Sequence, residues 1–123
     1  MENPVPIDHL EDKEGTRCIF TGECVRNEID YGYLSVNEML LLKDIKDETG
    51  QIVTDYQWFN MAKGFSNANL FPGDVVEFSG KVKKNTLGKK KLFDGSYSSI
   101  KDNFKITFPS KVRKIAGATD GGN

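Results

Sequence analysis

The chain has 123 residues, of which 37% are hydrophobic and 28% are charged, with a formal net charge of −1. A chain of this length forms one domain with one modest core, since a further domain needs on the order of 100 additional residues. No apolar run approaches the roughly 20 residues of a membrane span, and the acidic start is the reverse of a signal peptide, so we expect a cytoplasmic protein that contacts no membrane.

The N-terminal residues 1–15 lack periodicity, which predicts a flexible arm. From Thr16 onward, alternating residues predict a long first strand, and Gly22 in its middle predicts a bulge or a sharp bend. Residues 27–37 are rich in polar residues and tyrosine, and they predict a loop.

A β-hairpin is predicted next, because 39–45 and 52–60 are two β-rich runs separated by a turn that contains glycine. In the second run, Trp58 is expected to face the core. Gln57 and Phe59 share the opposite phase, which predicts that both face outward.

The central segment 61–69 is long enough for only one or two turns of helix. A strong turn at 70–74 then leads into a strand at 75–83, whose period of two indicates one buried and one solvated face.

The last third of the chain begins with residues 85–103, which predict a long polar loop. A final strand follows, with Phe104, Ile106 and Phe108 as its inward phase. Residues 117–123 are expected to be a disordered tail.

These elements predict an all-β protein: a five-stranded OB-type Greek-key barrel over residues 16–116, with a short helical segment between strands three and four. A parallel sheet is disfavoured, because no helix is long enough for a crossover connection. An immunoglobulin-like sandwich would require about seven strands.

The segment 70–82, with its Leu, its Gly-Asp turn and an alternating strand, resembles the start of the fourth strand in many OB-fold proteins. Over residues 16–115 the chain resembles a group of small uncharacterised proteins from plasmids, phages and conjugative elements of Gram-positive bacteria. Trp58-Phe59-Asn60, Lys63-Gly64-Phe65 and Pro109-Ser110-Lys111-Val112 carry this resemblance. The resemblance implies the barrel fold and, as for OB folds in general, the binding of oligonucleotides or oligosaccharides; it supplies no catalytic signature.

Charge is divided unevenly along the chain. Residues 1–80 hold six Lys or Arg against fifteen Asp or Glu, whereas residues 81–114 hold eleven against two. Such asymmetry indicates an anionic partner for the basic segment. The alternative is internal, with the basic segment neutralising the acidic one across the fold.

Of two predicted loops, 27–37 offers two tyrosines and 85–103 combines aromatic residues with lysines, and OB folds bind their ligands between the corresponding loops. Lysine contacts phosphate without reading sequence, and aromatic rings accept any base by stacking. The candidate nucleic-acid-binding residues are Tyr31, Tyr33, Gln57, Phe59, Lys81, Lys83, Lys84, Lys89, Lys90, Lys91, Phe93 and Tyr97.

Each group has a structural alternative. Residues 89–91 could be a solvated loop tip, and Phe93 could pin the long loop onto the barrel. Tyr31 and Tyr33 could close one end of the barrel, and Phe59 could pack under the short helix.

Catalysis finds little support in the sequence. The single histidine, His9, falls in the expected arm, so no Ser-His-Asp or Cys-His arrangement is indicated. Cys18 and Cys24 are expected to be small core residues, and we predict no metal site and no cofactor.

The leading hypothesis is a single-stranded DNA-binding accessory protein of a mobile genetic element, with low sequence specificity, that acts in replication or transfer. RNA is an alternative ligand, and homo-oligomers or replication and transfer proteins are possible partners. The second hypothesis is a protein-interaction adaptor or inhibitor that uses its acidic surface and binds no nucleic acid.

Overall fold

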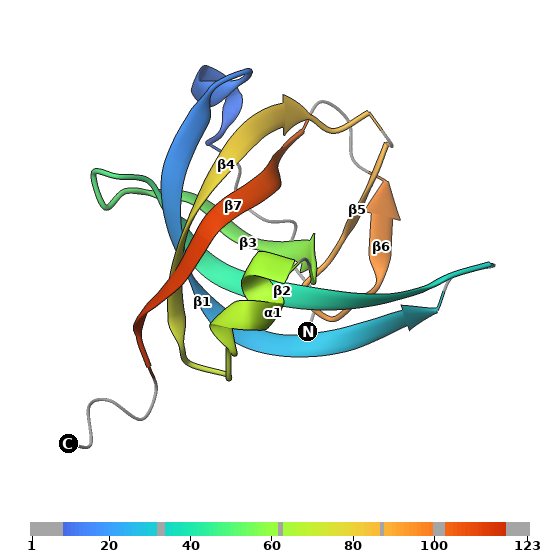
Figure 1. The fold of residues 1–123 in the computed structure, drawn as a ribbon. Coiled ribbons are helices and arrows are strands. Elements are labelled where there is room, and N and C mark those ends of the chain that lie inside the picture. Colours follow the sequence, from blue (N-terminus) through green and yellow to red (C-terminus); the bar gives the residue numbers. More distant parts are fainter. Residues whose placement is uncertain (1–8, 32–33, 62, 87, 100–102, 118–123) are drawn as a thin grey trace.

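The computed structural model describes residues 9–31, 34–61, 63–86, 88–99 and 103–117 (Figure 1). Most of this chain lies in β-strands, as expected. The elements in chain order are a 3₁₀ turn (Glu11–Lys13), β1 (Arg17–Tyr31), β2 (Val36–Lys46), β3 (Ile52–Asn60), α1 (Lys63–Ala68), β4 (Val75–Lys84), β5 (Lys89–Lys91), β6 (Tyr97–Ser99) and β7 (Phe104–Ala116).

Five strands form one antiparallel sheet in the order β3-β2-β1-β4-β7, and β5 and β6 form a separate two-stranded sheet. The five predicted strands and the short helix between β3 and β4 are confirmed. The bulge expected at Gly22 is also present, as a register shift between Thr21 and Glu23 in the pairing of β1 with β2. Glycine suits this position, because a Cβ at residue 22 would come within 3.3–3.4 Å of side-chain atoms of Leu42 and Ile45.

The sheet is open, with β3 and β7 as its edge strands. These edges meet through one side chain: Gln57 of β3 donates from Nε2 to the Ile106 carbonyl oxygen at 2.8 Å, and the Ile106 N–H donates to Gln57 Oε1 at 3.0 Å. On the adjacent strand β4, Gly80 allows Ile106 to approach, because a Cβ there would collide with the Ile106 side chain.

The main core fills the inner face of the curved sheet, where Phe20, Phe59, Phe65 and Phe78 meet ring against ring. Phe65 comes from α1, so the helix contributes directly to this core. A second cluster of Leu41, Tyr56 and Trp58 lies on the other face of β2 and β3, with Phe93 packed against it.

The predicted phase of β3 is therefore wrong. Phe59 faces the main core, Gln57 shares its phase at the seam, and Trp58 belongs to the second cluster. The error arises because the β5–β6 region covers the outer face of β3. Tyr56 and Phe93 meet edge to face there, with ring centroids 5.3 Å apart.

The predicted loops are shorter than expected. Residues 85–103 contain the β5–β6 hairpin, in which Lys89 pairs with Ser99 and Lys91 with Tyr97. The expected loop at 27–37 is mostly strand, because β1 runs to Tyr31 and β2 begins at Val36. Together they form a projecting β1–β2 arm, seen beside β6 in Figure 1.

Packing against the sheet begins before residue 15, the expected end of the N-terminal arm. Leu10 is fully buried in the main core, and the His9 N–H donates to the Val53 carbonyl at 2.7 Å. Residues 1–8 of the expected arm and 118–123 of the expected tail lie outside the described residues. Among the described helices, none has the length and apolar character required to cross a membrane.

The prediction that Phe108 faces inward is also wrong. Thr107 pairs with Lys81 and Ser110 with Ser79, so two residues of β7, Phe108 and Pro109, stand opposite the single residue Gly80. This bulge reverses the alternation, and the Phe108 side chain is 60% exposed whereas Ile106 is buried.

Candidate functional site

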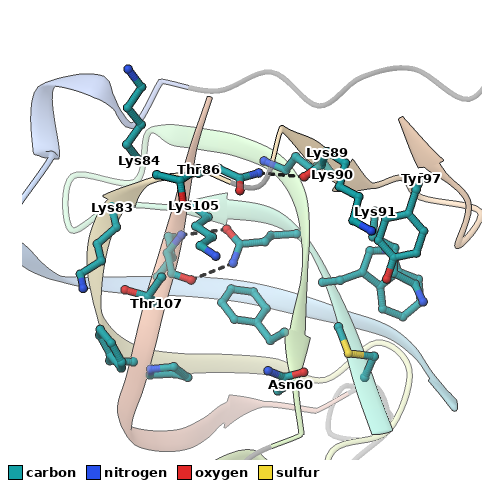
Figure 2. Close-up of a pocket in the computed structure, with 18 residues that line it drawn as sticks. Asn60, Lys83, Lys84, Thr86, Lys89, Lys90, Lys91, Tyr97, Lys105 and Thr107 are labelled. Atoms are coloured by element: carbon teal, nitrogen blue, oxygen red, sulfur yellow. Dashed lines mark hydrogen bonds between the residues drawn. The ribbon is translucent and has the colours of Figure 1, made fainter. Parts of the chain in front are cut away.

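The candidate site is a cleft of about 910 Å³ between β3, the end of β4, the β5–β6 hairpin and β7. It lies over the seam that Gln57 makes with Ile106 (Figure 2). Its lining residues are Met39, Gln57, Trp58, Phe59, Asn60, Lys83, Lys84, Asn85, Thr86, Lys89, Lys90, Lys91, Tyr97, Lys105, Ile106, Thr107, Phe108 and Pro109.

The lining is cationic. It contains six lysines, and none of these lining residues is an Asp or a Glu. Lys83, Lys84 and Lys89 are exposed, and Lys105 is half-buried. Like charges gathered in one concave region raise the local potential and attract anions. The cleft therefore suits a ligand that carries several negative charges.

One side of the cleft is built around Tyr97 of β6. The Lys89 ammonium lies 5.2 Å and the Lys91 ammonium 5.5 Å from the centre of the Tyr97 ring. The ring is half exposed, and its hydroxyl donates to Asp30 Oδ2 at 2.8 Å. Asp30, on the β1–β2 arm, thus fixes the orientation of an aromatic ring at the edge of the cleft.

Asp30 also forms an ion pair with Lys91, at 3.2 Å. The hydrogen bond from Tyr97, together with that from Lys91, lowers the pKa of the Asp30 carboxyl from its ordinary value of 3.8. Burial, and then the bond to Asp30, raise the pKa of Tyr97 from 10.0 to about 12. Near neutral pH, Tyr97 is therefore a neutral donor and Asp30 an ionised acceptor.

Trp58 forms part of the cleft wall and is held on several sides. Its Nε1 donates to the Leu92 carbonyl at 2.7 Å, and the Lys91 ammonium lies 4.9 Å from its ring centre. The Arg26 guanidinium lies 5.2 Å from the same ring and donates to the Phe93 carbonyl at 2.6 Å. Trp58 is only 7% exposed, so it supports the hairpin and offers little ring surface to a ligand.

The other side of the cleft is built around Phe108 of β7. The Lys83 ammonium lies 4.8 Å from the centre of the exposed Phe108 ring. Figure 2 shows Lys83 and Thr107 on this side and Tyr97 on the other, with Lys105 between them.

The three consecutive lysines 89–91, all predicted to bind nucleic acid, differ in their burial and in their partners. Lys89 is exposed, but Lys90 is only 8% exposed and its ammonium lies 3.4 Å from the Phe104 carbonyl oxygen. The Lys91 side chain is 9% exposed and paired with Asp30. Of the three, Lys89 is the one placed to meet a ligand.

Several other candidates lie away from the cleft. Tyr31 is 76% exposed, but neighbouring residues of a strand face opposite sides, and Asp30 is the one facing Tyr97. Phe93 packs against the second cluster, as its structural alternative proposed. Lys81 is half-buried outside the lining, and Tyr33 lies outside the described residues.

The sequence reasoning missed Trp58, Lys105 and Phe108 as cleft residues. Lys105 alternates with the inward residues Phe104 and Ile106, so its outward position was available from the pattern. The outward orientation of Phe108 could not be predicted from the alternation, because the bulge reverses it. The only local signal was Pro109, since proline in a strand is confined to edges and bulges.

The possible His, Cys, Asp or Glu metal ligands and the thiols in the described part of the chain lie outside the cleft lining. No group of three or more His, Cys, Asp or Glu residues there could hold a metal ion. Cys24 is buried and free, and burial raises the pKa of its thiol to about 11, which keeps it protonated and unreactive near neutral pH.

The molecule is thus defined as a mostly β protein with a cationic, partly aromatic cleft. Comparison of the sequence and structure with protein-family models, curated proteins and solved structures gives no significant match. The function must therefore be argued from the geometry of the cleft.

Proposed function

We propose that this chain is an accessory protein that binds single-stranded nucleic acid with low sequence specificity. DNA is the favoured ligand and RNA the variant, and the protein has no enzymatic activity and needs no cofactor. We propose that it acts in the cytoplasm, in the replication or transfer of a mobile genetic element. This biological role is proposed from the resemblance to proteins of plasmids, phages and conjugative elements.

The OB-type Greek-key barrel is part of the proposal. The strand order β3-β2-β1-β4-β7 and the helix between β3 and β4 support it. The Gln57 amide supports it too, since its two hydrogen bonds to Ile106 join the edge strands that a barrel would close.

The single observation that carries the proposal is the cleft lining, which holds six lysines and no Asp or Glu and in which Lys83, Lys84 and Lys89 are exposed. In a chain whose overall charge is −1, this is a strong local separation of charge. Ammonium groups in a groove track a phosphate backbone regardless of base sequence, and binding releases counterions.

The aromatic rings favour a single strand over a duplex. Tyr97 and Phe108 are both at least half exposed at the cleft, where unpaired bases could stack on them. A duplex hides its base faces, and reading its major groove usually requires a helix. The described helix α1 has only 6 residues, which is too short for that role.

The proposal is tested by fluorescence anisotropy with a labelled single strand of about 30 nucleotides and the matching duplex. Titrations at about 50 mM and about 200 mM salt measure the electrostatic contribution. A Lys83→Ala/Lys89→Ala variant removes two exposed cleft charges. The control variant, Lys43→Ala/Lys46→Ala, also removes two lysine charges, but from positions outside the cleft lining.

We expect tighter binding to the single strand, with an affinity that falls as salt rises. The cleft variant should reduce the slope of log affinity against log salt by about 1.4, for the loss of two phosphate contacts. The control variant should leave this slope unchanged. Absence of binding at low salt, or equal effects of both variants, would contradict the proposal.

A protein-interaction role is the second candidate, and one observation favours it. The β1–β2 arm carries four exposed large apolar side chains, Ile29, Tyr31, Leu34 and Val36. Exposed apolar clusters mark contact surfaces. Sedimentation of the wild type against a Tyr31→Ser/Val36→Ser variant tests it together with the anisotropy titration. Self-association that the variant abolishes, in a wild type that binds no nucleic acid, would favour this role.

A further inference from the structure

We infer that the cleft binds one strand across the seam between β3 and β7, with one base stacked on Tyr97 and another on Phe108. This inference rests on the proposed function and adds to it that one strand occupies both rings at the same time, with Phe108 as the second base-stacking site. The ligand it implies is a short run of nucleotides rather than a mononucleotide.

Phe108 is turned outward by the backbone itself. It begins the bulge opposite Gly80, and its φ of 51° lies in the left-handed region that bulky residues rarely adopt. Residues held in such conformations persist only where surrounding contacts enforce them, and they cluster at functional sites. The strained backbone conformation of β7 therefore coincides with the residue that exposes an aromatic ring at the cleft.

Arg17 on β1 supplies the contacts that hold this conformation. Its Nη1 donates to the Phe108 carbonyl at 3.1 Å, to Ser110 Oγ at 3.1 Å and to Ser79 Oγ at 3.2 Å. One guanidinium therefore ties both sides of the bulge to the sheet. The Phe108 ring is exposed on a fixed support rather than on a flexible loop.

The surroundings of Phe108 repeat those of Tyr97. Each ring is at least half exposed in the cleft, and each has a lysine ammonium about 5 Å from its centre, Lys83 at 4.8 Å and Lys89 at 5.2 Å. A base could replace the ammonium on the ring face, and the flexible lysine could then contact the adjacent phosphate.

The space between the two rings is suited to the sugar-phosphate backbone. Lys105 lies between the two sides, as Figure 2 shows, and the seam residue Gln57 is part of the cleft lining. Since the rings stand on opposite sides of the cleft, a ligand must be long enough to reach both. Affinity should therefore rise in a step when the strand reaches the second ring.

The test is a series of unlabelled dT oligomers of about 2 to about 12 nucleotides, measured by calorimetry against wild type and three variants. Phe108→Ala removes the inferred site and Tyr97→Ala removes the other ring. Phe71→Ala is the matched control, because Phe71 is 59% exposed and has the Lys114 ammonium 5.8 Å from its ring, but lies outside the cleft.

We expect Phe108→Ala to weaken binding of the longest oligomer by roughly 5- to 100-fold, and to abolish the step with length. The shortest oligomers should be affected much less, and Phe71→Ala should match the wild type. Phe108→Gly, which relieves the backbone strain, should give the same binding loss in a folded protein. A U oligomer of the longest length, run in parallel, separates RNA from DNA.

Two outcomes would overturn the inference, and they differ. If Tyr97→Ala weakens binding while Phe108→Ala behaves like Phe71→Ala, the second site is absent but the proposed function stands. If the wild type binds none of the oligomers, both the inference and the proposed function fail.

Discussion

The side-chain amide of Gln57 pairs with the backbone of Ile106 as one peptide group pairs with another across two strands. Both bonds have ordinary N–H···O lengths, 2.8 and 3.0 Å, and Gln57 is only 6% exposed. One side chain thus takes the place of a backbone rung between the two edge strands of the sheet. It also forms part of the cleft lining, so the seam and the candidate site share a residue.

Gln57→Glu should destabilise the protein in a pH-dependent way. An ionised carboxylate can still accept from the Ile106 N–H, but its second oxygen faces the Ile106 carbonyl oxygen. Burial and this repulsion should raise the folded-state pKa of the introduced carboxyl above its unfolded value of about 4.3. The stability of the Gln57→Glu variant relative to the wild type should therefore be greatest below about pH 4.3, the unfolded-state pKa. It should be lost as the pH rises through the folded-state pKa of the introduced carboxyl.

Urea unfolding from about pH 4 to pH 8 measures this difference in the free energy of unfolding. Gln51→Glu, at an exposed position in the β2–β3 turn, is the matched control and should show little pH dependence. Gln57→Met removes both hydrogen bonds and should cost about 2–4 kcal/mol at every pH. An unchanged stability for Gln57→Met would show that the seam does not hold the strands together.

Neighbouring lysines of β5 should respond differently to substitution. Lys89→Met changes an exposed side chain, so we expect weaker nucleic-acid binding and an unchanged melting temperature. Lys90→Met removes a buried ammonium from the Phe104 carbonyl, so we expect a lower melting temperature. Thermal unfolding and anisotropy on both variants check this division, and a reversed pattern would contradict the assignment of Lys89 to the ligand.

Asp30→Asn should lower the pKa of Tyr97 from about 12 toward its ordinary value of 10.0, because the carboxylate bond contributes to the shift after burial. Titration of phenolate absorbance in the near ultraviolet measures this change. The Asp30 pKa is itself lowered, so its stabilising effect is present above 3.8 and is lost as pH falls through the folded value.

The stability difference between wild type and Asp30→Asn should therefore be constant near neutral pH and shrink in acid. Glu48→Gln, at an exposed site in the β2–β3 turn, controls for the loss of one carboxylate. If the difference grew on acidification, the Asp30 pairing with Lys91 and Tyr97 would not be stabilising.

Phe108→Gly should stabilise the protein while weakening ligand binding. Glycine adopts a φ of 51° without steric cost, whereas a bulky residue there stores about 1–3 kcal/mol. After the greater chain entropy of glycine in the unfolded state is subtracted, we expect a gain of about 1 kcal/mol. Chemical denaturation checks it, and a loss of more than about 1 kcal/mol would show that the ring itself stabilises the fold.

The succession of the five main strands along the chain could be predicted, because each strand has clear local signals in the sequence. The turn at Gly50 and the bulge at Gly22 agree with the structure, and so does the alternation of 75–83 except at Ser79, which is buried. These features depend on residues close together in the sequence. The seam could not be predicted, because Gln57 and Ile106 are 49 residues apart.

The orientation of side chains was harder to predict where both faces of a strand are buried. On β3 the alternation of Trp58 and Phe59 is real, but it does not reveal which face holds the main core. The charge of the candidate site was predicted from the lysines of the basic segment. The split between exposed Lys89 and buried Lys90 depends on how the hairpin lies on the sheet, which no local pattern encodes.

The bulge on β7 makes the number of residues between Thr107 and Ser110 as important as their identities. Both flanks are anchored, by Thr107 opposite Lys81 and Ser110 opposite Ser79. Deleting Pro109 would keep these pairs but place Phe108 directly opposite Gly80, as an ordinary strand residue on the same face as Ile106. A one-residue deletion would therefore turn the ring away from the cleft, even though Phe108 itself is retained.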